Sequence, residues 1–128
     1  ARQVSTSRLR LFSYPKCGTC RKALQWLDQQ GFSVGKGTLE LIDITQQPPA
    51  LEELQLAFNS LGRKRLFNTS GQSYRALGAA AVAALSDDEA LAALAADGKL
   101  IKRPFAITDA GTALVGFKPE EWQAALGS

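Results

Sequence analysis

Both cysteines of the chain lie in one nine-residue stretch, Tyr14-Pro15-Lys16-Cys17-Gly18-Thr19-Cys20-Arg21-Lys22. Residues 9–12 before it are mostly apolar, as in a buried strand, and residues 23–27 after it place apolar side chains at helical spacing. This order predicts a strand, a turn at the cysteines, and a helix that begins at or near Cys17. Cys20 then follows one helical turn later, on the same face.

The start of a helix favours the thiolate form of a cysteine. Unpaired backbone N–H groups and the positive end of the helix dipole stabilise a negative charge there. Flanking cations add positive potential: Lys16, Arg21 and Lys22. We therefore expect Cys17 to attack, activated in part by Arg21, and Cys20 to resolve, with Gly18 and Thr19 in the turn between them. The alternative is a pair of inert, partly buried thiols.

The composition is that of one ordinary domain without a strong charge. The chain has 128 residues, of which 45% are hydrophobic, and this is enough for a core of its own. Its net charge is +3, and the basic residues are spread among acidic ones, which is too weak a bias to indicate nucleic-acid binding. We predict a single domain over residues 1–128 that binds neither a membrane nor nucleic acid directly.

The apolar segments are too short for secretion or membrane insertion. Residues 1–7 are polar, and no run of signal-peptide length follows before Tyr14. The longest uncharged stretch, around residues 76–85, is too short to span a bilayer. We expect a cytoplasmic protein. In that reducing compartment a lone cysteine pair is more often catalytic, redox-sensing or metal-binding than a structural disulfide.

The cysteine pair supplies too few ligands for a zinc site. A structural zinc site usually takes four Cys or His ligands, and this chain has two cysteines and no histidine. We expect no metal site within one chain, although two copies could share one at an interface. The lack of histidine also excludes Cys-His catalysis, so activation of Cys17 must come from the helix start and nearby cations.

The rest of the sequence predicts the element order of a thioredoxin-like fold. Further strands are expected at residues 39–44, 105–108 and 112–117, the last two as a hairpin. Helices are expected at residues 50–60, 74–77 and 79–85, from a Ser86–Glu89 capping box to a stop at Gly98, and from Pro119 onwards, and Gly31 is expected to end the first helix. The fold class is therefore α/β, with a helical subdomain inserted between the second strand and the closing hairpin.

A short basic cluster occupies residues 62–65, before the apolar pair Leu66 and Phe67. Such clusters usually belong to connectors that face solvent. The alternative is a contact with an anion or a partner near the cysteine turn. The sequence leaves both interpretations open.

Five ordered motifs run through nearly the whole chain. They are Lys-Cys-Gly-Thr-Cys-Arg-Lys-Ala at 16–23, Asn-Thr-Ser-Gly at 68–71, Tyr-Arg-Ala-Leu-Gly at 74–78, Leu-Ile-Lys-Arg-Pro at 100–104 and Val-Gly-Phe-Lys at 115–118. Together they resemble the arsenate reductase/Spx family, and the chain looks closest to its small Spx-like proteins. The resemblance implies a thioredoxin-like domain in which Cys17 is the attacking thiol.

The resemblance also implies a wall opposite the cysteine turn. In that wall Arg103 precedes a cis-proline, Pro104. A guanidinium held there lowers the pKa of a facing thiol and can bind an oxyanion. Arg103 is therefore expected to activate Cys17 and to bind anions.

Three functions remain open. The first is a thiol-disulfide oxidoreductase in which Cys17 and Cys20 form an intramolecular disulfide, with glutathione, glutaredoxin or thioredoxin as reductant and no bound cofactor. The second is a redox-switched regulator that binds the RNA polymerase α subunit. The third is arsenate reduction supported by glutathione and glutaredoxin. Two departures from that family pattern weigh against the third: Cys20 stands where serine is usual, and further arginines are missing at about Asn68 and residues 116–118.

Overall fold

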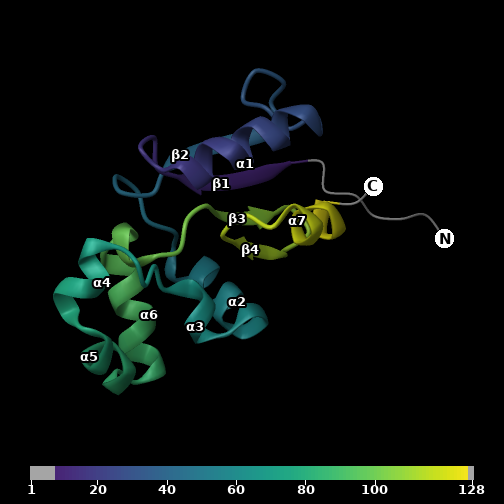
Figure 1. The fold of residues 1–128 in the computed structure, drawn as a ribbon. Helices are drawn as coiled ribbons and strands as arrows, with labels where there is room; N and C mark the ends of the chain where they lie inside the picture. The colour runs from purple at the N-terminus through teal and green to yellow at the C-terminus, as the bar shows by residue number, and fades with distance from the viewer. Residues whose placement is uncertain (1–7, 127–128) are drawn as a thin grey trace.

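The computed structural model describes residues 8–126, which form a four-stranded mixed sheet covered by helices (Figure 1). β1 (Leu9–Ser13) pairs in parallel with β2 (Leu39–Asp43) and antiparallel with β3 (Phe105–Thr108). β3 in turn pairs antiparallel with β4 (Ala113–Val115), so that the strand order is β2-β1-β3-β4. This topology confirms the predicted thioredoxin-like α/β fold. Residues 1–7, the polar segment at the start of the sequence, lie outside the described residues.

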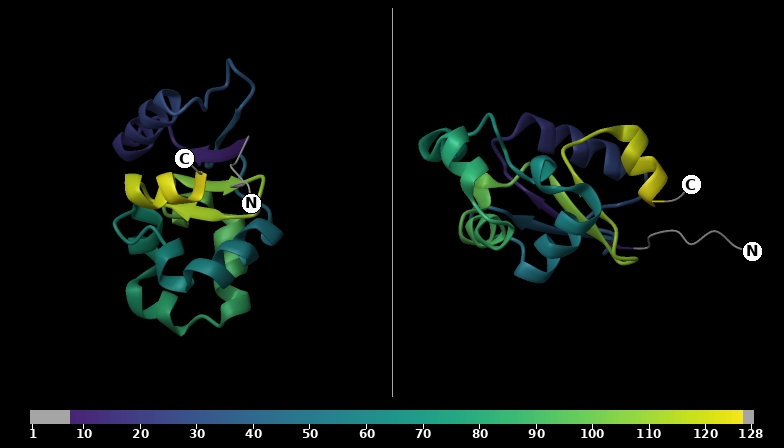
Figure 2. Two further views of the ribbon diagram at one scale, coloured as in Figure 1. Left: turned by 90° about the vertical axis from the view of Figure 1, so that its right-hand side faces the viewer. Right: turned by 90° about the horizontal axis from the view of Figure 1, so that it is seen from below.

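The helices form two groups. α1 (Gly18–Gln29) connects β1 to β2, and α7 (Pro119–Leu126) follows β4. The inserted helical subdomain comprises α2 (Leu51–Leu61), α3 (Arg63–Leu66), α4 (Gln72–Leu77), α5 (Ala79–Ala84), α6 (Asp87–Ala96) and the 3₁₀ turn η1 (Gly98–Leu100). It lies on the side of the sheet away from α1 (Figures 1 and 2). No helix among residues 8–126 has both the length and the apolar character that a membrane span requires.

The alternation of side chains along β1 creates two cores. Leu9 and Leu11 are fully buried in a cluster that also contains Trp122 of α7, whereas Phe12 belongs to the cluster built with the helical subdomain. Successive side chains of a strand point to opposite faces, so one strand serves both layers. Phe12 meets Phe105 of β3 edge to face, with ring centres 5.8 Å apart.

The predicted helix ends are largely confirmed. Gly31 has a φ of +93° and, together with Phe32, returns N–H groups to the last turn of α1 in a Schellman arrangement. Ser86 and Glu89 exchange hydrogen bonds as a capping box at the start of α6. Other limits differ from the predictions by one or two residues, because frayed helix and strand ends are not fixed by pattern alone. β4 is shorter than the predicted strand at 112–117.

α6 ends two residues before Gly98, close to the predicted stop, but Gly98 is not a left-handed cap like Gly31. The helix ends at Ala96, Asp97 is extended with a φ of −142°, and Gly98 instead begins η1. The position requires glycine for another reason: a Cβ added to Gly98 would lie 1.9 Å from the carbonyl oxygen of Ile44. This close approach packs the end of the helical subdomain against the residue that follows β2.

Gly98→Ala is expected to lower the free energy of unfolding by about 1–3 kcal/mol, because the backbone of Ile44 or of the 3₁₀ turn must move to admit the methyl group. The measurement is the midpoint of urea unfolding. Gly35→Ala is the matched control, since nothing lies within 4 Å of a Cβ added at that exposed loop position, and it should change stability by less than about 0.5 kcal/mol. Equal midpoints for the two variants would contradict the close approach.

Candidate functional site

Cys17 is the N-cap residue of α1. Its backbone is extended, its N–H donates to the Tyr14 carbonyl at 3.0 Å, and its Sγ accepts the backbone N–H of Cys20 at 3.4 Å. The sulfur thus takes the place that a serine or aspartate oxygen takes at an ordinary N-cap. The structure places both cysteines as the spacing predicts, with Gly18 and Thr19 forming the exposed first residues of the helix.

The surroundings of Cys17 favour its thiolate. Partial burial opposes ionisation, but hydrogen bonds from the thiol and backbone N–H of Cys20, the charge of Arg103 and the N–H of Thr19 outweigh it. The pKa of Cys17 is therefore lowered from its ordinary value. Because the side chain is only half-buried, the stabilised thiolate can still be reached from the cleft.

Cys20 has the opposite environment. Its side chain is 1% exposed, and burial, followed by the interaction with Cys17, raises the pKa of Cys20 to about 12. Both cysteines are free thiols in this structure. Two neighbouring titratable groups with pKa values pushed apart have different roles. Here Cys17 is the thiol that ionises more readily, and the Cys20 thiol donates a hydrogen bond to the Cys17 sulfur.

Arg103 faces the cysteine turn. Its guanidinium carbon lies 5.0 Å from the centre of the Tyr14 ring, in a cation–π contact. Tyr14 therefore contacts both sides of the site: its ring lies against Arg103, and its carbonyl accepts the N–H of Cys17. The Arg103–Pro104 peptide bond is cis, as the resemblance implies, and Pro104 is buried. The sequence analysis assigned no role to Tyr14; its position directly before the cysteine turn is the signal that could have found it.

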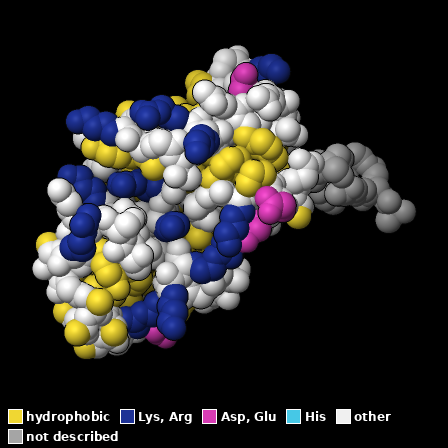
Figure 3. All heavy atoms as spheres, viewed as in Figure 1, with side chains coloured by type: hydrophobic (Ala, Val, Ile, Leu, Met, Phe, Trp, Pro, Cys, Tyr) yellow, Lys and Arg dark blue, Asp and Glu magenta, His cyan; other side chains and the backbone are white. Residues whose placement is uncertain are grey.

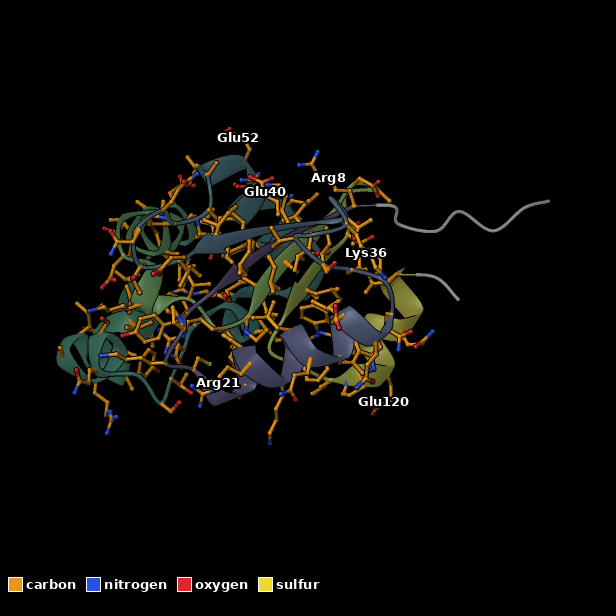
Figure 4. All side chains as sticks on the ribbon, turned by 90° about the horizontal axis from the view of Figure 1, so that it is seen from above. Arg8, Arg21, Lys36, Glu40, Glu52 and Glu120 are labelled. Carbon is orange, nitrogen blue, oxygen red and sulfur yellow. The ribbon has the colours of Figure 1, made fainter. Side chains whose placement is uncertain are left out.

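Arg21 is placed differently from Arg103. Its guanidinium donates to the carbonyl oxygen of Pro15 at 3.2 Å, and the residue is exposed near the start of α1 (Figure 4). Among the described cations, Arg103 is the one whose charge lowers the pKa of Cys17. Activation of Cys17 by Arg21 stays a prediction.

A basic cleft of about 580 Å³ opens in front of Cys17. Its walls come from the cysteine turn, from residues 64–71, from residues 102–103 and from residues 115–118. Five cations line it: Lys64, Arg65, Lys102, Arg103 and Lys118. No acidic side chain belongs to the described lining. Figure 3 shows Lys and Arg side chains gathered around the hollow between α1 and the helical subdomain.

Backbone pairing brings two of these walls together. Phe67 and Ile101 form an isolated antiparallel bridge, and the flanking N–H groups of Asn68 and Lys102 donate to Leu100 and Leu66, each at 2.8 Å. Residues 64–68 are thereby fixed beside residues 102–103. This long-range pairing explains why cations far apart in the sequence line one cleft.

The basic cluster at residues 62–65 is divided between two roles. Arg63 points away from the cleft, donating to the Val82 carbonyl at 2.6 Å and to Asp87 at 3.3 Å. Lys64 and Arg65 line the cleft, as the functional alternative for this cluster predicts. Asn68 is 9% exposed and is also part of the cleft wall.

Comparison with known proteins places the chain in a family. The ArsC family matches residues 12–125. YusI of Bacillus subtilis is 43% identical over 118 residues, covering 90% of this chain and 95% of YusI. An arsenate reductase of Neisseria meningitidis is 30% identical over 121 residues, covering 92% and 97% of the two chains. The regulatory protein MgsR of B. subtilis is 27% identical over 116 residues, covering 89% and 86%.

Solved structures agree with the sequence relatives. An ArsC family related protein from Bacteroides fragilis superimposes with a TM-score of 0.81 at 36% identity, covering 92% of this chain and 97% of that one. The match includes both the sheet and the inserted helical subdomain, because it spans almost all of each chain. The chain therefore belongs to the ArsC family, and its general chemistry is that of a thiol redox protein.

Proposed function

We propose that the protein is a cytoplasmic thiol-disulfide oxidoreductase in which Cys17 attacks and Cys20 resolves. The observation that carries the proposal is the contact between the two cysteines. Cys17 is the half-buried N-cap residue of α1, and the buried Cys20 donates hydrogen bonds from its backbone N–H and its S–H to the Cys17 sulfur. A one-cysteine mechanism gives the second thiol no role. No bound cofactor is needed, because glutathione, glutaredoxin or thioredoxin can supply the reducing thiols.

The proposed reaction has two exchange steps. The Cys17 thiolate attacks one sulfur of a substrate disulfide, forms a mixed disulfide with it, and releases the other half as a thiolate. Cys20 then gives its proton to that leaving thiolate or to water, attacks the Cys17 sulfur, and releases the second half. Two electrons pass to the substrate, and the Cys17–Cys20 disulfide that remains is reduced by the external thiol.

Arg103 contributes to the first step in this proposal. Its charge faces Cys17 and stabilises the thiolate, and the helix start adds the same effect through its free N–H groups. The Tyr14 ring holds the guanidinium in place. We propose a smaller contribution from Arg21, whose guanidinium is bonded to the Pro15 carbonyl.

Alkylation of Cys17 should show a midpoint pH below the value of about 8.5 for an unperturbed cysteine, because a lowered pKa makes the thiolate available at lower pH. Arg103→Gln should move this midpoint up, by about 0.5–1 unit for the loss of one facing charge. The measurement is the iodoacetamide rate at Cys17 against pH in the protein with Cys20 intact, with tandem mass spectrometry to distinguish the two cysteines.

Arg21→Gln is the matched control for this prediction. It also removes one positive charge near the start of α1, but from a guanidinium that is bonded to the Pro15 carbonyl. A larger shift in Arg21→Gln than in Arg103→Gln would contradict the assignment of Arg103 as the main activating cation. An unshifted Cys17 in the unsubstituted protein would contradict thiol activation altogether.

Trapping experiments separate the two cysteines. With a disulfide substrate, Cys20→Ser should accumulate a mixed disulfide on residue 17, because nothing displaces the bound half. Cys17→Ser should form no adduct, since the pKa of Cys20 is raised to about 12 and its side chain is 1% exposed. Peptide mapping by mass spectrometry gives the readout. Equal adduct formation in the two variants would rule out the assigned order.

Arsenate reduction is the second candidate function. It is favoured by Arg103 beside Cys17 in a basic cleft and by the likeness to a protein named arsenate reductase. A coupled assay with arsenate, glutathione and glutaredoxin tests it. Turnover that survives Cys20→Ser and is lost in Cys17→Ser would favour this candidate; we expect disulfide substrates to react faster than arsenate.

A regulatory role is the third candidate, favoured by the likeness to the regulatory protein MgsR. In this case formation of the Cys17–Cys20 disulfide changes the surface presented to RNA polymerase. Retention of the polymerase α subunit by only one redox form of the protein would support it. Retention by neither form would exclude it.

A further inference from the structure

The cleft is much larger than the contact between Cys17 and one small anion requires. A volume of about 580 Å³ falls in the range of sites that hold whole organic ligands. Four of its five cations, Lys64, Arg65, Lys102 and Lys118, are not among the groups that lower the pKa of Cys17. These cations can bind parts of a substrate other than the reacting sulfur.

Arg65 and Lys118 share one carboxylate at the rim of the cleft. The Nη2 atom of Arg65 lies 2.9 Å from one oxygen of Glu121, and the Nζ atom of Lys118 lies 4.0 Å from the other. Glu121 belongs to α7 and is not part of the cleft lining. The hydrogen bond from Arg65, with the charges of both cations, holds the pKa of Glu121 below its usual value despite some desolvation.

We propose that Arg65 and Lys118 form a carboxylate subsite of the cleft, that Glu121 occupies it when no substrate is bound, and that Cys17 therefore prefers disulfides that carry carboxylates. This inference rests on the proposed oxidoreductase function and names its substrate class. Electrostatic complementarity supplies the preference: five cations line the cleft, without an acidic residue in its described lining.

Displacing the Glu121 carboxylate from Arg65 costs little free energy. The side chains of Arg65 and Glu121 are each 37% exposed, and an ion pair of this exposure stabilises a protein only weakly. A substrate carboxylate that enters the cleft can replace Glu121 on the guanidinium, since it accepts the same charge-assisted hydrogen bond from Arg65. Glu121 then returns to solvent at the rim, so no charge is left buried and unpaired.

The substrate reaction remains the balanced exchange described above. A dicarboxylate disulfide loses its S–S bond, the two electrons come from the Cys17 and Cys20 thiols, and the products are two carboxylate-bearing thiols and the protein disulfide. The carboxylate on Arg65 takes no part in bond making. Its role is to hold the disulfide within reach of Cys17.

Three small disulfides of related length test the preference. They are 3,3′-dithiodipropionate, which is a dianion, bis(2-hydroxyethyl) disulfide, which is neutral, and cystamine, which is a dication. The readout is the second-order rate constant for formation of the Cys17–Cys20 disulfide. We expect the dianion to react fastest and the dication slowest, with the differences shrinking as salt screens the charges.

Matched variants test whether the preference for the dianion arises from Arg65 and Glu121 at the rim of the cleft. Arg65→Gln should lower the dianion-to-neutral rate ratio about threefold to fivefold, and Glu121→Gln should raise it by a similar factor. Glu120→Gln removes the same charge one residue away on α7, and Lys36→Gln removes a cation beyond the far end of α1 from Arg21 (Figure 4). Neither control should change the ratio.

Two results would overturn the inference. One is an unchanged ratio in Arg65→Gln; the other is an equal change in Glu121→Gln and Glu120→Gln, which would indicate only the overall field of the protein. A purely structural ion pair between α3 and α7 would lower the urea midpoint in both Arg65→Gln and Glu121→Gln without moving the ratio in opposite directions.

Binding of octanedioate keeps the subsite testable if no disulfide is reduced. This dicarboxylate has the length of the dianionic disulfide but no sulfur. In an NMR titration, Glu121→Gln should bind it more tightly than the unsubstituted protein, and Arg65→Gln more weakly. Reduction of none of the three disulfides would overturn the proposed function, whereas octanedioate affinities equal in all variants would overturn the subsite.

Discussion

The site depends on the hydrogen bond by which the backbone N–H of Cys20 caps α1 through the sulfur of Cys17. An N-cap acceptor satisfies N–H groups that the first turn of a helix leaves unpaired. When that acceptor is a thiolate, the same contact that stabilises the helix start also stabilises the charge needed for attack. Folding of α1 and activation of Cys17 are therefore parts of one arrangement, and any change that moves the helix start alters both.

The two cores keep this arrangement in place. α1 and α7 pack on one face of β1 through Leu27 and Trp122, and the helical subdomain packs on the other through Phe12. The subdomain does more than cover the sheet, because the bridge between Phe67 and Ile101 brings its basic segment to the cleft. A thioredoxin-like sheet supplies the cysteine turn and its facing arginine, and the inserted helices supply much of the charge around them.

The sequence predicted local features well and long-range ones poorly. The helix start at Cys17, the Gly31 cap and the capping box at Ser86 follow from short-range chemistry that a pattern displays directly. The cleft does not, because Lys64 and Lys102 come to line it only through backbone pairing between distant segments. Gly98 shows the same limit: it resembles a helix stop, but its actual constraint is the carbonyl of Ile44, which lies far away in the chain.

In the proposed function, Cys17 and Cys20 form one two-electron redox couple. An equilibrium redox titration of the whole protein, with the disulfide mapped by mass spectrometry at each point, tests it most directly. We expect a single reversible transition between two free thiols and one Cys17–Cys20 disulfide within the chain. Oxidation that yields only disulfides between chains or with small thiols, and never this internal bond, would contradict it.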